Sequence, residues 1–367
     1  MSQDHPKDDS SAVPTAQTKH DAPNATASPS LLDELLSMRT PLARFILHPM
    51  EQIKLMGSSI RQMMGKKFDP DQDITDQTGK VILVTGGNTG LGKETILQLA
   101  KHHPARIYLA ARNTAKTQAA IADIQAHLAQ PIDIRHLPLD LSSFASIHTA
   151  ANQFTSSSDR LDTLILNAAI MTPRRNATTA SGHEIHLGTN HLGHFLLTQL
   201  LLPTLLHTAA STSDVRIITI ASMAWQMSPP LPTLLHTASL LACTSHARYG
   251  ASKAANIAFA AELARRYPQL TSVSLHPGVI FTGLYDASGA ANPVVRVGVK
   301  MLRPFSADER QGSLNHLWAA GVERGVLRSG EYYTPVGVGG WGNEWAEDGE
   351  VGRRLWEWSE GEVGGKG

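Results

Sequence analysis

Val-Ile-Leu-Val-Thr-Gly-Gly-Asn-Thr-Gly-Leu-Gly-Lys-Glu-Thr, residues 81–95, is the stretch that decides the fold. Its first four residues are apolar, which is typical of a short strand buried on both faces of a parallel sheet. From Lys93 the pattern becomes helical and places Ile96, Leu97 and Ala100 on one face. A strand, a glycine turn and a helix in this order indicate a loop that binds the diphosphate of a dinucleotide.

The glycines of this turn are spaced as Thr-Gly-x-x-x-Gly-x-Gly. Gly86 permits the tight turn, Gly90 lets the backbone approach a diphosphate, and Gly92 lets the helix pack closely on the strand. The phosphates are expected at the positive end of the helix, where backbone N–H groups are free. Asn88 and Leu91 complete the predicted cofactor-binding turn.

Length and composition limit the classes of protein that the chain can belong to. Its 367 residues suffice for one large α/β domain with additional segments at the ends. The formal net charge is zero, which gives no support for a nucleic-acid partner. Cys243 is the single cysteine and suits a reducing compartment, and no apolar run is long enough to span a membrane. A cytoplasmic location is therefore expected.

Four regions are predicted along the chain. Residues 1–30 have almost no large apolar side chains and are expected to be a disordered tail. Residues 31–79 are interpreted as an amphipathic helical extension that ends in a polar linker from residue 68. Residues 80–335 form the predicted catalytic domain, and residues 336–367 are a tryptophan-rich segment whose tryptophans are expected to dock a terminal helix.

The extension leaves two interpretations open. Apolar residues recur at helical spacing in 31–67, and basic residues outnumber acidic ones. A basic amphipathic helix can lie on a membrane surface, which would give peripheral membrane association. It can also pack on the catalytic domain or on a second subunit, and a homo-oligomer would then be one outcome.

Strand-like and helix-like segments alternate after residue 80, which indicates a parallel sheet with helices on both faces. Further strands are predicted at Arg106–Ala110, Ile132–His136, Leu161–Leu166, Val215–Ile220, Ser272–His276 and Glu331–Thr334. The expected fold is therefore α/β, with a doubly wound, Rossmann-like parallel sheet of about seven strands. Such a sheet binds its ligand at the carboxyl ends of its strands.

The end of the second predicted strand indicates which cofactor is bound. Sites for NAD usually carry an acidic residue here, but the sequence reads Leu-Ala-Ala-Arg-Asn at 109–113. A guanidinium can grip a ribose 2′-phosphate, whereas a carboxylate would repel it. Arg112 therefore favours NADP(H) over NAD. The alternative interpretation is that Arg112 is only a solvated residue at the end of a strand.

Three residues in the second half carry the predicted chemistry. Ser222 follows the fifth strand, and Tyr249 and Lys253 lie four residues apart, on one face of an alanine-rich helix. A phenol has a pKa of about 10, so acid–base work near neutral pH requires a group that stabilises the phenolate. The neighbouring ammonium can do this, while Ser222 holds the substrate oxygen by a hydrogen bond.

With these motifs in order, the sequence resembles the short-chain dehydrogenase/reductase family, retinol-dehydrogenase-like members included, over about residues 79–282. The resemblance implies a catalytic set of Asn190, Ser222, Tyr249 and Lys253. It implies cofactor contacts from Thr85, Gly86, Gly90, Gly92, Asp140, Leu141, Asn167, Tyr249, Lys253, Pro277, Gly278, Val279 and Thr282. Ala169 stands where the family usually has glycine. The Phe68-Asp-Pro opening and the glycine stretch also resemble enzymes of fungal specialised (secondary) metabolism.

The expected function is NADP(H)-dependent interconversion of a carbonyl and an alcohol on an apolar substrate, with Tyr249 as general acid/base. The segments 225–246 and 284–311 are rich in apolar residues, and they either flank the substrate or only cover the core. A non-catalytic NADP-binding redox sensor or scaffold is one alternative, and a membrane-surface retinoid or lipid reductase is another. His183, His186, His191 and His194 lie close in sequence, but no metal site is expected from ligand type alone.

Overall fold

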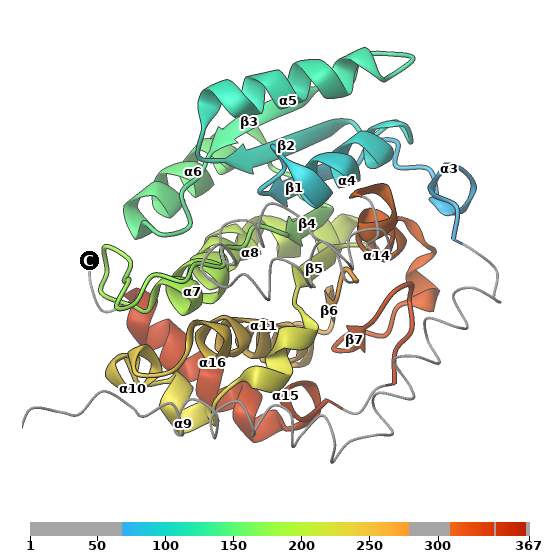
Figure 1. Ribbon diagram of the computed structural model, residues 1–367. Helices are drawn as coiled ribbons and strands as arrows, with labels where there is room; N and C mark the ends of the chain where they lie inside the picture. The colour runs from blue at the N-terminus through green and yellow to red at the C-terminus, as the bar shows by residue number, and fades with distance from the viewer. Residues whose placement is uncertain (1–67, 279–308, 341–342, 365–367) are drawn as a thin grey trace, which may run out of the picture. The chain divides into compact units, whose positions relative to one another are not determined.

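The computed structural model describes residues 68–278, 309–340 and 343–364 (Figure 1). The expectations for residues 1–30 and 31–67, and for Val279 and Thr282, lie outside these ranges. Within them, no helix is long and apolar enough to cross a bilayer.

Seven parallel strands form one sheet in the order β3-β2-β1-β4-β5-β6-β7. The strands are β1 Val81–Thr85, β2 Arg106–Ala111, β3 Ile134–Pro138, β4 Thr163–Leu166, β5 Arg216–Ile220, β6 Thr271–Leu275 and β7 Tyr332–Tyr333. The order reverses between β1 and β4, so the sheet is doubly wound, as predicted. All seven predicted strands are present within two residues of their expected ends.

The third strand begins two residues later than predicted. The backbone of Ile132 is bound by a side chain instead of by the sheet, because Gln125 Nε2 donates to its carbonyl at 2.5 Å. Pairing with β2 starts at Ile134, which lies opposite Ile107.

Helices cover both faces of the sheet. Before the switch point they are α3 Pro70–Asp73, α4 Gly90–Ala100, α5 Thr114–Ala126 and α6 Phe144–Ser157. After β4 come α7 Ile185–Leu187, the π-helix η1 Gly188–Leu192 and α8 Gly193–Ser211. The rest are the 3₁₀-helices η2 Met223–Met227 and η4 Arg324–Val326, with α9 Leu231–Leu234, α10 Thr237–Leu241, α11 Ser245–Arg266, α14 Glu309–Gly321, α15 Glu344–Glu347 and α16 Gly349–Gly364. Helices far apart in sequence lie side by side, such as α4 with α14 and α11 with α16.

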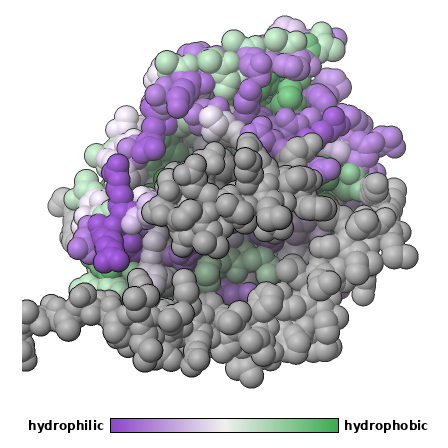
Figure 2. Space-filling model, in the orientation of Figure 1, coloured by the Kyte–Doolittle hydropathy of each residue, from purple (hydrophilic) through white to green (hydrophobic). Residues whose placement is uncertain are grey.

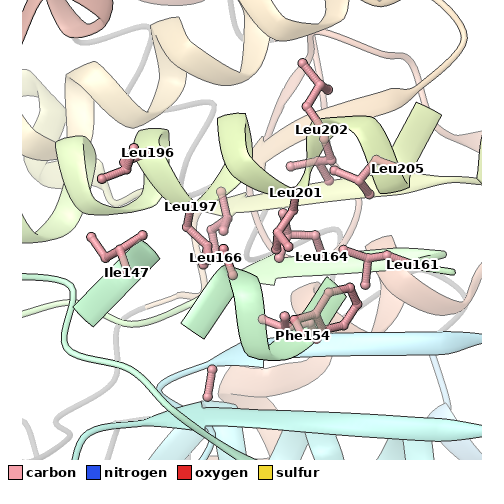
Figure 3. Close-up of a cluster of buried hydrophobic side chains, with 14 of the residues drawn as sticks. Ile147, Phe154, Leu161, Leu164, Leu166, Leu196, Leu197, Leu201, Leu202 and Leu205 are labelled. Carbon is pink, nitrogen blue, oxygen red and sulfur yellow. The ribbon is translucent and has the colours of Figure 1, made fainter. Parts of the chain in front are cut away.

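Alternating strand residues build two separate cores, because successive side chains of a strand point to opposite faces. Val81 and Leu83 pack in one cluster with α6, α8 and α11, and Ile82 and Val84 pack in the other with α4, α5 and α14. Figure 3 shows the first cluster, where leucines of α8 lie over β4 and α6. In contrast, Figure 2 shows hydrophilic residues mixed with weakly hydrophobic ones on the outer surface around α5. The continuous apolar run at 81–84 therefore reflects burial on both faces.

The two ends of the described domain are packed. Residues 68–79, expected as a polar linker, are held to α14 because Thr75 N and Oγ1 both donate to Gly321 O, at 2.8 and 2.9 Å. Ile74 lies against the same glycine. At the other end Trp356 of α16 is buried against Phe195 and Phe259, with ring centroids 5.0 and 5.9 Å apart. This tryptophan docks the terminal helix, as expected.

Candidate active site at the carboxyl edge of the sheet

The glycine turn connects β1 to α4. Gly86 and Gly90 have φ angles of +68° and +55°, which L side chains rarely adopt. A Cβ at position 92 would lie 2.5 Å from the carbonyl oxygen of Gly86, so Gly92 allows the close approach of helix and strand. The N-cap residue Thr89 makes no side-chain cap hydrogen bond, which leaves first-turn N–H groups of α4 open to an anion. The turn therefore fits a diphosphate, and Asn88 and Leu91 lie in it.

Asn167 closes this turn from the end of β4. Its Nδ2 donates to Thr85 O at 2.8 Å and lies 3.5 Å from Gly86 O. The next residue, Ala168, donates its N–H to the hydroxyl of Thr85 at 3.0 Å. Asn167 was predicted to contact the cofactor, and its amide nitrogen shapes the turn that would do so.

The ends of β2 and β3 carry the other predicted cofactor residues. Arg112 is exposed directly after β2 and has no hydrogen bond or ion pair to the described residues. After β3, Asp140 Oδ1 accepts from Ser142 N at 2.9 Å and from Ser142 Oγ at 2.7 Å. Leu141 is buried, and its backbone touches Gly193, where any Cβ would collide with it.

Ser222 lies two residues beyond β5 and is the N-cap of the 3₁₀-helix η2. Its Oγ accepts a hydrogen bond from Ala224 N at 3.2 Å, and the residue is half-buried. The same helix packs on α11, where a Cβ at Gly250 would lie 2.5 Å from Ala224 O. This close contact brings Ser222 beside the helix that carries Tyr249.

Tyr249 and Lys253 share one face of α11. The ammonium of Lys253 lies 5.7 Å from the centroid of the Tyr249 ring, and both residues are buried. Lys253 Nζ donates to Ile220 O at 2.9 Å, and Asn256 Nδ2 donates to the same carbonyl at 3.1 Å. Burial lowers the pKa of Lys253 to about 7. The surroundings of Lys253 therefore make its charged form less favourable than it is in water.

Asn190 lies in the π-helix η1, a rare geometry that is often found at functional sites. Its side chain grips Ile170, accepting from Ile170 N at 2.8 Å and donating to Ile170 O at 3.0 Å. Nδ2 also donates to Ser252 Oγ, at 3.0 Å, next to Lys253. Asn190 thus joins the residues after β4 to the helix that carries the lysine.

The four clustered histidines have separate partners, and no group of three metal-ligating side chains forms among the described residues. His191 Nε2 lies 2.9 Å from Ser359 Oγ. His194 Nδ1 donates to Asn190 O at 2.9 Å, and its Nε2 lies 2.9 Å from Thr85 Oγ1. His194 therefore links Thr85, which precedes the glycine turn, to the π-helix η1. Sequence reasoning missed this role, because the histidine spacing suggested only a metal site to be weighed and dismissed.

Pro277 and Gly278 follow β6, and Gly278 has a φ angle of +102°. The preceding residue, His276, is held by β7 and α14, because its N–H donates to Tyr333 O at 2.8 Å and its carbonyl accepts from Asn315 Nδ2 at 2.8 Å. The described predicted site residues thus follow β1 to β6 at one edge of the sheet or lie on the helices packed there.

Comparison with known proteins gives consistent matches. The pattern of the family described as short chain dehydrogenase matches residues 80–292. The chain is 38% identical over 301 residues to a short-chain dehydrogenase/reductase of Armillaria gallica, covering 78% of this chain and 91% of the relative. It is 36% identical over 285 residues to retinol dehydrogenase 11 of Homo sapiens, covering 76% and 84%. The solved Pseudomonas aeruginosa RhlG/NADP active-site complex is similar in fold, with a TM-score of 0.56, 24% identity, and coverage of 71% of this chain and 96% of that chain.

Proposed function

Because the chain belongs to the short-chain dehydrogenase family, we propose that it is an NADP(H)-dependent oxidoreductase that interconverts a carbonyl and an alcohol on an apolar substrate. The observation that carries the proposal is the shared face of α11, where a buried ammonium lies 5.7 Å from the ring centroid of a tyrosine. Ser222 follows the strand whose last carbonyl, that of Ile220, binds the same ammonium.

The cofactor would lie along the carboxyl edge of the sheet. The turn at Gly86–Gly92 and the N-terminus of α4 would take its diphosphate, and Asp140 its adenine end. The exposed guanidinium of Arg112 would pair with a 2′-phosphate, since no acid stands at the end of β2 to repel it. When bound, the cofactor supplies or accepts the hydride, and the protein supplies alignment and charge.

In the reduction, Tyr249 would donate a proton to the substrate oxygen, and in the oxidation it would accept one. A charged Lys253 stabilises the phenolate that remains after donation, because opposite charge favours the ionised form. Ser222 would hold the same oxygen by a hydrogen bond and so orient the carbonyl. With a pKa of about 7, Lys253 would release and regain a proton while Tyr249 is protonated again for the next turnover.

An apolar substrate is supported by the side chains next to Ser222. Met223, Trp225 and Met227 of η2 are half-buried, so they present some apolar surface beside the reacting position. In contrast, Leu234 and Leu240 of the same segment are fully buried in a core cluster with α11, and they cover the core. The name of one relative, retinol dehydrogenase 11, refers to an apolar alcohol, which agrees with this proposal.

The test is a panel of aliphatic, aromatic and polyene aldehydes, ketones and alcohols, each assayed with NADP(H) and with NAD(H) at the nicotinamide absorbance band. We expect turnover of an apolar carbonyl or alcohol and a preference for NADP(H). A protein that binds NADPH and turns over no member of the panel would contradict the enzymatic proposal and favour a sensor or scaffold. Equal use of both cofactors would contradict the role of Arg112.

A further inference from the structure

Three charged or titratable side chains next to the site have no part in the mechanism above. Glu184, His186 and Arg248 are all buried, with exposed fractions of 0%, 0% and 1%. Such groups are rarely buried unless they are paired, because removing charge from water is costly. Glu184 Oε1 lies 2.7 Å from His186 Nδ1 and 3.7 Å from Arg248 Nε, so the three form one network.

The hydrogen bonds fix the proton positions on His186. Thr172 N is a backbone donor and lies 3.0 Å from His186 Nε2, so Nε2 must be the acceptor. The proton therefore sits on Nδ1, which donates to Glu184. The second carboxylate oxygen of Glu184 accepts from His186 N and Leu187 N, at 2.9 Å each, and caps α7. The carboxylate thus sets both the tautomer and the orientation of the ring.

Thr172, whose N–H donates to His186, belongs to a short loop after β4. This loop, residues Ile170–Arg174, is here named the β4 loop. Side chains fix its backbone at each end and in the middle. Asn190 binds Ile170, and Ser245 Oγ donates to Thr172 O at 2.7 Å. Arg248 Nη2 donates to Arg174 O at 3.0 Å.

The β4 loop is tied to the first turn of the helix that carries Tyr249. Ser245 lies one turn before the tyrosine, and Arg248 is its neighbour in sequence. The ring of His186 also meets the ring of Tyr249 edge to face, with centroids 6.2 Å apart. The loop leaves the sheet between β1 and β5, whose ends carry the glycine turn and Ser222. A substrate that reaches Tyr249 and Ser222 would therefore meet this loop.

We propose that the Glu184–His186 pair is a positioning device that fixes the β4 loop and Tyr249 relative to each other, and so sets one wall of the substrate site. His186 acts through Thr172 N and through the edge of the Tyr249 ring. The effect on turnover rests on the proposed function, whereas the fixing of the loop does not.

The β4 loop carries its own reporter, because Arg174 and the following Arg175 are exposed trypsin sites. Native protein is treated with trypsin, and cleavage after these two residues is followed by mass spectrometry. His186→Phe keeps an aromatic side chain and removes both ring nitrogens. We expect cleavage there to be at least about fivefold faster, the effect of losing one hydrogen bond on local opening. His316→Phe is the matched control, since it makes the same change at a buried histidine of α14 whose ring nitrogens have no hydrogen-bond partner among the described residues, and it should leave this cleavage rate unchanged.

Two further variants keep the test decisive. Ser245→Ala removes one anchor at the start of α11 and should also speed cleavage, even if His186→Phe does not fold. His186→Gln keeps an acceptor and a donor and should restore part of the protection. Wild-type cleavage rates in both His186→Phe and Ser245→Ala would overturn the proposal, as would equal acceleration in His316→Phe.

Activity gives the second readout. For a carbonyl compound that the wild type reduces, kcat of His186→Phe should fall about tenfold, because the reacting groups lose alignment, while KM for NADPH stays unchanged. An unchanged kcat would contradict the positioning role. A fall in kcat that is accompanied by a rise in KM for NADPH would contradict it as well. Absence of turnover in the wild type would reject the proposed function alone, since the cleavage comparison would still test the loop.

Discussion

Lys253 Nζ donates a 2.9 Å hydrogen bond to the main-chain carbonyl of Ile220, the last residue of β5. Ser222 lies two residues beyond this carbonyl, and Tyr249 lies one helical turn before the lysine. The bond therefore fixes the distance between the residue that would hold the substrate oxygen and the residue that would exchange its proton. It also leaves the remaining protons of the ammonium for other partners.

Replacing Lys253 by Met should separate the proposed catalytic role of the ammonium from its effect on stability. We expect kcat to fall about 100-fold or more, because the phenolate of Tyr249 loses its opposite charge. The pKa of Lys253 is about 7 in the folded chain and about 10.5 in the unfolded chain, so the unfolded chain binds more protons between these values. The wild type therefore gains stability as pH rises through this window, and the variant should lack that gain.

The measurement is kcat together with chemical unfolding at about pH 6.5 and about pH 9.5. Lys116→Met, at an exposed position of α5, is the control and should change neither kcat nor the pH dependence of stability. A Lys253→Met variant with wild-type turnover would remove the lysine from the mechanism. If the stability of the two proteins changed with pH in the same way, this would contradict a lowered pKa for Lys253 in the folded chain.

Acid should destabilise the fold through four buried histidines, namely His191, His194, His276 and His316. Burial lowers their pKa values to about 3, 4, 4 and 3. The unfolded chain protonates them near pH 6.5, so their contribution to stability is complete above that value and falls as pH drops toward about 4. Each contributes a slope of about 1.4 kcal/mol per pH unit.

His316→Leu isolates one of these contributions, since neither ring nitrogen of His316 has a hydrogen-bond partner among the described residues. Urea unfolding between about pH 4.5 and pH 6 should show a slope smaller by about 1.4 kcal/mol per pH unit than that of the wild type. Identical slopes would show that His316 does not remain neutral in the folded chain.

Arg112→Glu should change the cofactor preference. We expect KM for NADPH to rise about 10- to 100-fold, because a charge-assisted pair with the 2′-phosphate is replaced by repulsion. KM for NADH should fall or stay constant, because the new carboxylate can bind the ribose hydroxyls. Steady-state kinetics with both cofactors test this, and Lys116→Glu controls for the change in charge. An unchanged ratio of the two KM values would reject the assignment.

Gly92→Ala should damage the cofactor turn specifically. Its Cβ would lie 2.5 Å from Gly86 O and 2.6 Å from Asn167 Nδ2, so α4 must move away from β1. We expect a loss of about 1–3 kcal/mol in stability and at least about tenfold weaker NADPH binding. Gly361→Ala, where a Cβ meets nothing within 4 Å, should leave binding unchanged. Titration of NADPH fluorescence and thermal unfolding measure both effects, and tight binding by Gly92→Ala would contradict the packing argument.

The fold could be predicted because β1, β4 and β5, at the centre of the sheet, are short segments rich in apolar residues. Prediction was weaker at the edge, where β3 reads Ile-Arg-His-Leu-Pro and has one fully buried residue, Leu137. Without a continuous apolar run, its start depends on the bond between Gln125 and Ile132, which sequence does not reveal. The contact of Ile74 with Gly321 was likewise not predicted, because residues 68–79 are mostly polar.

The site could be predicted where residues act at fixed local spacing, as in the glycine turn and in the Tyr249–Lys253 pair. The supporting residues could not, because their partners are distant in sequence. His194 bonds Thr85, which lies 109 positions away, and Asn190 bonds Ser252 at a separation of 62. The backbone groups that hold the site together, such as Ile220 O and Thr172 N, carry no signal in residue type.

The most direct test of the central claim is NADPH binding and turnover of Tyr249→Phe, measured on the same sample. The substitution removes the hydroxyl and keeps the ring that lies near Lys253 and His186. We predict an NADPH Kd within about twofold of the wild type, and a kcat lower by about 100-fold or more, because the general acid is lost. A Tyr249→Phe protein that binds NADPH and retains full turnover would contradict the account.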